Sequence, residues 1–152
     1  MKEVGYSSIS IVLETWDAAR FSSKDFDLDF GMLALERLFE LQPRAKIVFG
    51  YDKGEEEGRK HASVHAKAFA GLFDSVFQML GPDVDFIQDI LKQVGIRHKA
   101  MGVSPSFFPF MGQALMHAME TFLGKKLNDE QQGAWEEVYD AISNEIVKNI
   151  LM

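Results

Sequence analysis

Two histidines, His65 and His98, are the residues whose type and position point most directly to chemistry. Each falls on the apolar stripe of a segment with helical periodicity, the first at 56–80 and the second at 87–98. A lone histidine on such a stripe is most often a structural residue that bonds a backbone carbonyl. A second one argues against that explanation, because a neutral imidazole is also a common metal ligand. The pair is therefore a candidate site for a metal held between two helices.

The composition narrows the chemistry that this pair could support. The sequence has no cysteine, which excludes a thiolate nucleophile, a thiolate metal ligand and a disulfide. It also lacks the HExxH, GxSxG and phosphate-loop motifs, and the ExxH pairs of a di-iron bundle. Its 13 Phe residues would supply flat apolar walls of the kind that a porphyrin needs. We therefore predict an iron porphyrin bound between the two helices, with a neutral imidazole on the iron.

Length and charge set the class of protein. At 152 residues and 47% hydrophobic content, the chain suits one domain, 1–152, with a substantial core. A net charge of −7 disfavours nucleic acid and anionic lipid as partners. No apolar run approaches the roughly 20 residues that span a bilayer, and no signal peptide is evident at the N-terminus. We expect a cytoplasmic protein that is a monomer or a weak homodimer.

Periodicity elsewhere in the chain predicts an all-α fold. Helices are expected at 9–19, at 104–122 and from Asn128 to Ile150, where Gln131 completes a capping box. The segment 25–30 alternates with period two and by itself would suggest a strand. A helical pattern continues to residue 42, and its length favours a helix for the whole stretch. We therefore predict a fold of six to eight helices arranged in a helical sandwich.

Proline and glycine mark the expected boundaries. Pro43 either ends one helix or opens a short one, and Gly81-Pro82 ends the helix that carries His65. The Gly-rich and charged stretch 50–58 is expected to be a surface loop. Ser104-Pro105 suits the start of a helix, but Pro109 removes one backbone donor, so this helix should kink or start late.

Several segments resemble the globin family. In RLFELQPRAKIVF, at 37–49, a helix that carries Phe ends at a proline and a second Phe follows, as in globins. VGIRHKAMGV at 94–103 and FFPFMGQALMHAMETFLG at 107–124 resemble the proximal-histidine helix and the helix after it. AWEEVYDAI at 134–142 resembles the last globin helix. The resemblance covers roughly residues 8–150, is closest to the neuroglobin and cytoglobin group, and implies a globin fold around a haem pocket.

The same resemblance implies roles for individual residues. His98 would be the proximal ligand of the haem iron and His65 the distal histidine, with His61, one turn earlier, as the alternative distal residue. Gly31 would match the small residue at which two helices cross closely, opposite Ala66. The cofactor-binding residues implied are Leu35, Phe49, His65, Phe69, Val94, His98, Val103 and Phe108. Arg97 and Lys67 are candidate partners of the haem propionates.

By resemblance, the function is that of a haem-b globin that reversibly binds dioxygen, carbon monoxide and nitric oxide. His65 would either coordinate the iron when no ligand is bound or donate a hydrogen bond to the bound ligand. The alternative is a redox or signalling globin that works with a reductase in electron transfer, nitric oxide dioxygenation or ligand sensing. A peroxidase-like side activity would also fit this alternative. A third hypothesis is a globin-like interaction domain without haem.

Overall fold

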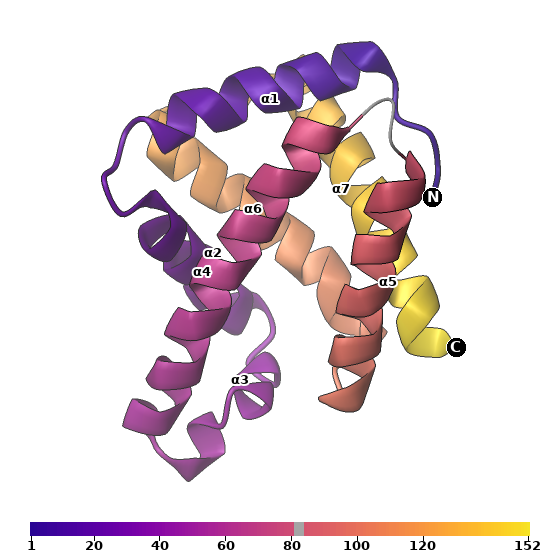
Figure 1. Ribbon diagram of the computed structural model, residues 1–152. Helices are drawn as coiled ribbons and strands as arrows, with labels where there is room; N and C mark the ends of the chain where they lie inside the picture. The colour runs from indigo at the N-terminus through magenta and orange to yellow at the C-terminus, as the bar shows by residue number, and fades with distance from the viewer. Residues whose placement is uncertain (81–83) are drawn as a thin grey trace.

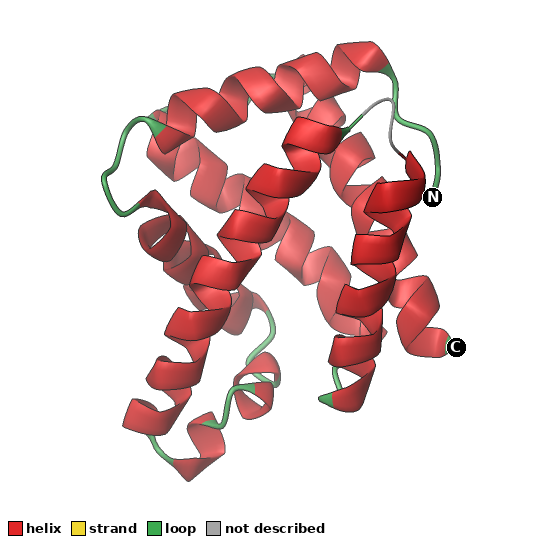
Figure 2. Cartoon of the chain, in the orientation of Figure 1, coloured by secondary structure: helices red, strands yellow, loops and turns green. Residues whose placement is uncertain are grey.

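Helices form nearly all of the computed structural model, which describes residues 1–80 and 84–152. The α-helices are α1 (Tyr6–Arg20), α2 (Phe26–Leu41), α3 (Ala45–Val48), α4 (Glu55–Met79), α5 (Val84–Ala100), α6 (Phe108–Leu123) and α7 (Asp129–Leu151). Two 3₁₀ helices, η1 (Tyr51–Lys53) and η2 (Pro105–Phe107), complete the described ranges, which contain no strand (Figure 2). None of these helices is both long and apolar enough to cross a bilayer. The all-α prediction is confirmed.

The start of α2 shows why the helical period prevails over the two-residue alternation. Phe26 and Phe30 are one turn apart on this helix, and both rings pack edge-on against Trp16 with centroids 5.2 Å away. In a strand Leu28 would lie on the same face as these two rings, whereas in the helix Phe26 and Phe30 are buried and Leu28 is only partly so. Asp27 and Asp29 fall in the first turn, where carboxylates interact favourably with the helix dipole.

The boundaries follow the prolines and glycines, with one correction. Pro43 separates the end of α2 from the start of α3, and α6 begins late, after η2. The expected loop at 50–58 is wrong in part, because η1 and the first turn of α4 occupy it. Gly54, at φ 132°, turns the chain between them. The predicted helix stop at Gly81-Pro82 lies outside the described residues.

The two histidine-bearing helices belong to different helix pairs. α4 packs mainly against α2, whereas α5 packs against α7, as Figure 1 shows. α6 joins the two halves by packing against α2 and α7, and α1 closes the top by packing against α7, α6 and α4. The relative position of His65 and His98 is therefore set mainly by the helices against which α4 and α5 pack.

Glycine allows both histidine helices to approach their partners closely. A Cβ atom on Gly31 of α2 would lie 2.7 Å from the Cβ of Ala66 on α4, so the predicted small-residue crossing is confirmed. Gly95 of α5 plays the same part against α7, where a Cβ would lie 2.6 Å from the Ile146 carbonyl oxygen and 2.6 Å from the Asn149 Cβ. A methyl group at either glycine would force the helices apart.

This crossing supports a first prediction about stability. We expect Gly31→Ala to lower the free energy of unfolding by about 1–3 kcal/mol, because the added methyl overlaps Ala66 backbone and side chain. Gly71→Ala is the matched control, since a Cβ there meets nothing within 4 Å, and it should raise stability by about 0.5–1 kcal/mol. Urea unfolding of the cofactor-free protein measures both. Equal changes in the two variants would contradict the close crossing.

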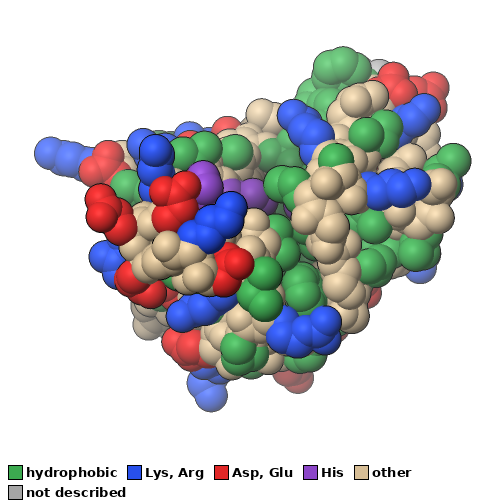
Figure 3. Space-filling view, turned by 90° about the horizontal axis from the view of Figure 1, so that it is seen from below, with side chains coloured by type: hydrophobic (Ala, Val, Ile, Leu, Met, Phe, Trp, Pro, Cys, Tyr) green, Lys and Arg blue, Asp and Glu red, His purple; other side chains and the backbone are tan. Residues whose placement is uncertain are grey.

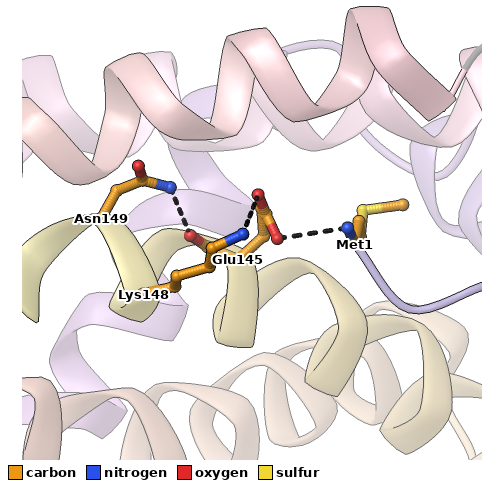
Figure 4. Close-up of polar contacts among 4 residues, drawn as sticks. All are labelled: Met1, Glu145, Lys148 and Asn149. Atoms are coloured by element: carbon orange, nitrogen blue, oxygen red, sulfur yellow. Dashed lines mark hydrogen bonds and ion pairs between the residues drawn. The ribbon is translucent and has the colours of Figure 1, made fainter. Parts of the chain in front are cut away.

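A buried carboxylate, that of Glu145, lies on α7 close to the residues that pack against Gly95. The Glu145 side chain lies 3.4 Å from the Met1 ammonium and 3.7 Å from the Lys148 Nζ, and Asn149 Nδ2 donates to the Glu145 backbone carbonyl at 2.8 Å (Figure 4). Two cations therefore compensate a charge that would be costly to bury alone. The same turn of α7 carries the Asn149 Cβ against which Gly95 packs.

Candidate functional site

His98 lies in the last turn of α5 with its ring orientation fixed. Its Nδ1 is 2.7 Å from the backbone carbonyl oxygen of Val94, one turn earlier. Because a carbonyl can only accept, Nδ1 carries the hydrogen and donates it, and in the neutral ring Nε2 keeps a free lone pair. Histidines that bind metals commonly donate their other ring N–H to a backbone carbonyl in this way. Burial lowers the pKa of His98, which favours the neutral ring.

His65 is a half-buried imidazole, one of whose nitrogens is buried and lacks a bonding partner among the described residues. Its Nδ1 is inaccessible and meets no hydrogen-bond partner among the described residues. Burial, together with the charge of His98, lowers the pKa of His65 to about 4, so the ring is neutral near pH 7. A buried nitrogen left unpaired destabilises the fold by about 1–3 kcal/mol, so such an atom calls for an explanation.

The two rings, one from α4 and one from α5, meet edge-on. Their centroids are 6.0 Å apart and their planes are at 84°. Two imidazole nitrogens bonded to a single metal at about 2 Å each would hold the ring centres about 6 Å apart. Phe49 packs edge-on against His65 at 5.3 Å, and Phe108 lies 5.8 Å from His98. Four of the residues chosen from the sequence therefore meet in one place.

The remaining predicted lining residues take two positions. Leu35 and Val103 belong to the smaller apolar cluster that also includes Phe49. Phe69 and Val94 belong to the main core, where the Phe69 ring contacts Phe30 and Phe73. Phe69 thus packs with the aromatic core of the protein.

His61 does not join the pair. Its side chain is 54% exposed, its Nδ1 lies 3.0 Å from the Phe49 carbonyl oxygen, and its Nε2 lies 3.4 Å from Glu57 Oε1. Both ring nitrogens therefore have partners outside the His65–His98 contact. Lys67 and Arg97, the candidate propionate partners, are both exposed, and the charge of Arg97 contributes to the lowered pKa of His98.

Figure 3 shows histidine side chains in a recess of the face viewed from below, with charged side chains gathered on one side of it and apolar ones on the other. A site of this kind is apolar inside and accessible at one edge, which is typical of cofactor sites.

Two supporting residues were not identified from the sequence. Gly95, three residues before His98, seats α5 on α7, and a glycine inside a helix is itself a signal because it costs about 1 kcal/mol relative to alanine. Tyr51 packs on α4 where a Cβ at Gly58 would lie 2.5 Å from its Cδ2. Nothing in the sequence indicated that contact, because residues 50–58 were expected to form a surface loop and no packing partner was predicted for them.

The lowered pKa of His65 predicts how the cofactor-free protein responds to acid. Between pH 6.5 and about 4 the unfolded chain takes up a proton at this position and the folded chain does not, so stability falls as the pH falls. The loss from this group approaches about 3 kcal/mol at the lower end. Urea unfolding across this range should therefore show a shallower pH dependence for His65→Leu than for the parent. If the free energy of unfolding of His65→Leu changed with pH as steeply as that of the parent, the burial of a neutral His65 ring would be contradicted. His117→Leu is the control and should keep the pH dependence of the parent.

The comparisons with known proteins identify the family. A sequence model of the globin family matches residues 33–146, and the chain belongs to that family. An anaerobic nitrite reductase of Oryza sativa is 28% identical over 136 residues, covering 88% of this chain and 86% of its own. One of Arabidopsis thaliana is 25% identical over 150 residues, with coverage of 94% and 92%. The neuroglobin of Tetraodon nigroviridis is 22% identical over 147 residues, with coverage of 93% and 89%.

Solved globins share the fold. A Drosophila melanogaster globin superposes with a TM-score of 0.81 at 19% identity, covering 95% of this chain and 94% of its own. A hexacoordinated haem protein from an anhydrobiotic tardigrade gives 0.82 at 20% identity, with coverage of 98% and 96%. The predictions of the globin family and the globin fold are both confirmed.

The globin family implies haem, and the residues present fit that group. His98 offers an unprotonated Nε2 on a ring oriented by Val94, and His65 offers a neutral ring with an unpartnered buried nitrogen. Aromatic rings lie against both imidazoles. A proximal histidine and apolar walls are the donor set and surroundings that haem iron requires in globins.

Proposed function

We propose that this chain is a haem-b globin that reversibly binds dioxygen and other diatomic ligands, such as carbon monoxide and nitric oxide. His98 would be the proximal ligand, and His65 would hold the sixth position when no external ligand is present. The observation that carries the proposal is the opposed pair of neutral imidazoles, with ring centroids 6.0 Å apart. Solved relatives in the same fold include a Drosophila haemoglobin described as hexa-coordinate, studied with cyanide.

When bound, haem would supply an iron that takes imidazole ligands, a redox couple and affinity for diatomic ligands. Val94 would keep the proximal imidazole in one orientation and one tautomer. The lowered pKa of His65 would keep that ring neutral, and only a neutral imidazole can coordinate. An external ligand could then bind only after His65 had dissociated, so the rate of ligand binding would be limited by that protein movement.

The second role open to His65 is donation of a hydrogen bond to the bound ligand. A neutral imidazole has one N–H, and a bond from it to dioxygen would slow both ligand loss and oxidation of the iron. The two roles are compatible, since a ring that leaves the iron remains within the same pocket.

The optical spectrum of the purified protein tests the proposal. We expect a red protein whose anaerobic ferrous form shows the split bands of low-spin, six-coordinate iron. A single broad high-spin band would contradict coordination by His65 while leaving the globin assignment intact. A colourless protein that refuses haemin would favour the interaction domain without haem.

A redox function is the second candidate, and the plant relatives named as anaerobic nitrite reductases favour it. Reduction of nitrite to nitric oxide and water consumes one electron and two protons, so ferrous iron would be oxidised to ferric and a reductase would have to restore it. Anaerobic formation of nitric oxide from nitrite by the ferrous protein tests this activity. Nitrate formation from the oxygenated protein and nitric oxide tests dioxygenation.

A further inference from the structure

The second histidine of α4, His61, connects this helix to the end of α3. Its Nδ1 lies 3.0 Å from the Phe49 carbonyl oxygen, and since that oxygen can only accept, His61 is the donor. The neighbouring backbone N–H groups bond elsewhere, with Gly50 donating to the Ile47 carbonyl at 3.0 Å and Lys53 donating to that of Gly50 at 2.9 Å. The imidazole of His61 therefore satisfies a carbonyl that the local backbone turns leave open.

Phe49 links this hydrogen bond to the ligand site. Its carbonyl accepts from His61, while its ring packs edge-on against His65 at 5.3 Å and against Phe39 at 5.4 Å. His65 cannot swing toward this side of the pocket unless the Phe49 ring moves. A movement of Phe49 away from α4 that displaces its backbone would break the bond that His61 makes.

The backbone around Phe49 is shaped for this contact. Gly50 has φ 86°, a conformation in which a side chain is strained, and a Cβ there would lie 3.5 Å from His61 Nδ1. Tyr51 packs on Gly58 of α4 and contacts Phe39 with ring centroids 5.4 Å apart. The segment 49–51 is thus held on the first two turns of α4 by the His61 hydrogen bond and by the packing of Tyr51 on Gly58.

We propose that His61 is a positioning residue that holds Phe49 against His65 and thereby slows the release of His65 from the sixth position. The inference rests on the proposed function, since it concerns the same pocket. It assigns to His61 a role that acts through Phe49 and involves no contact with the iron or its ligand. The positioning role depends on the hydrogen bond that His61 donates from Nδ1, and not on its ion pair with Glu57.

Four variants separate these contributions. His61→Leu removes the donor. His61→Asn places an amide N–H near the position of Nδ1, whereas His61→Gln places it near that of Nε2. Glu57→Gln removes the exposed ion pair at 3.4 Å and keeps the bond to Phe49, and exposed pairs of this kind contribute little.

The first measurement is the limiting rate of carbon monoxide binding to the ferrous haem protein, which reports release of His65. His61→Leu and His61→Gln are expected to speed it about fivefold, the factor that one lost hydrogen bond of ordinary strength produces. His61→Asn and Glu57→Gln should remain at the parent rate. A parent-like rate in His61→Leu, or equal rates in the Asn and Gln variants, would overturn the proposal.

The second measurement uses the cofactor-free protein. Amide hydrogen exchange at residues 49–54 should be faster in His61→Leu and should return to the parent rate in His61→Asn. Exchange that is equally fast in both would also overturn the positioning role. Failure of the proposed function looks different, because the parent protein itself would then show a high-spin ferrous spectrum. A low-spin parent whose rate is unchanged by substitution of His61 would contradict only the positioning role of His61.

Discussion

Replacement of His98 by alanine is expected to give a protein that folds but does not retain haem. The imidazole of His98 is the ring whose Nδ1 is committed to Val94 and whose Nε2 is available, and no other described histidine on α5 could take its place. Loss of a residue that only supports a metal ligand weakens metal affinity about 10–100-fold, so loss of the ligand itself should exceed that range. Haem titration of the cofactor-free variant, followed by absorbance, measures the loss.

Free imidazole provides the complementary test. Added imidazole should restore part of the haem uptake of His98→Ala, because the substitution leaves space for the missing ring beside Phe108. His117→Ala on α6 is the control and should take up haem as the parent does. Undiminished colour in His98→Ala, with circular dichroism showing an intact fold, would contradict the proximal assignment.

Replacement of His65 by leucine has the second-largest expected effect. The ferrous spectrum should change from split low-spin bands to a single high-spin band, since leucine fills the pocket but cannot coordinate. If His65 occupies the sixth position more than nine-tenths of the time, its removal raises the apparent affinity for carbon monoxide at least about tenfold. The association rate should then increase linearly with carbon monoxide concentration, without the plateau that ligand displacement imposes.

The same variant distinguishes the two roles of His65. A ferrous spectrum that is unchanged from the parent, combined with faster loss of dioxygen, would support hydrogen bonding alone and rule out coordination. Low-spin iron that persists in His65→Leu and disappears in His61→Leu would instead identify His61 as the distal ligand. The exposure of His61 and the engagement of both its nitrogens argue against that outcome.

The local chemistry of the chain was sufficient to predict most elements. Helical periodicity predicted the segment that became α4, and Asn128 with Gln131 predicted the start of α7, where the structure shows both bonds of the capping box. Such signals lie within a few residues of one another, so no tertiary information is required to interpret them. The prediction of a loop at 50–58 was wrong in part because the structure there depends on a tertiary contact, that of Tyr51 with Gly58 on α4.

The sequence by itself determined the elements, the family and a short set of histidines capable of holding iron. Only the tertiary structure decided which of them meet: His65 faces His98, whereas His61, one turn away, faces the carbonyl of Phe49. The physical reason is that one helical turn separates the two positions along the axis but barely rotates them, so periodicity gives them the same face. The pairing depends on where α2 and α7 hold α4 and α5, through Gly31 and Gly95, and those contacts join residues far apart in the chain.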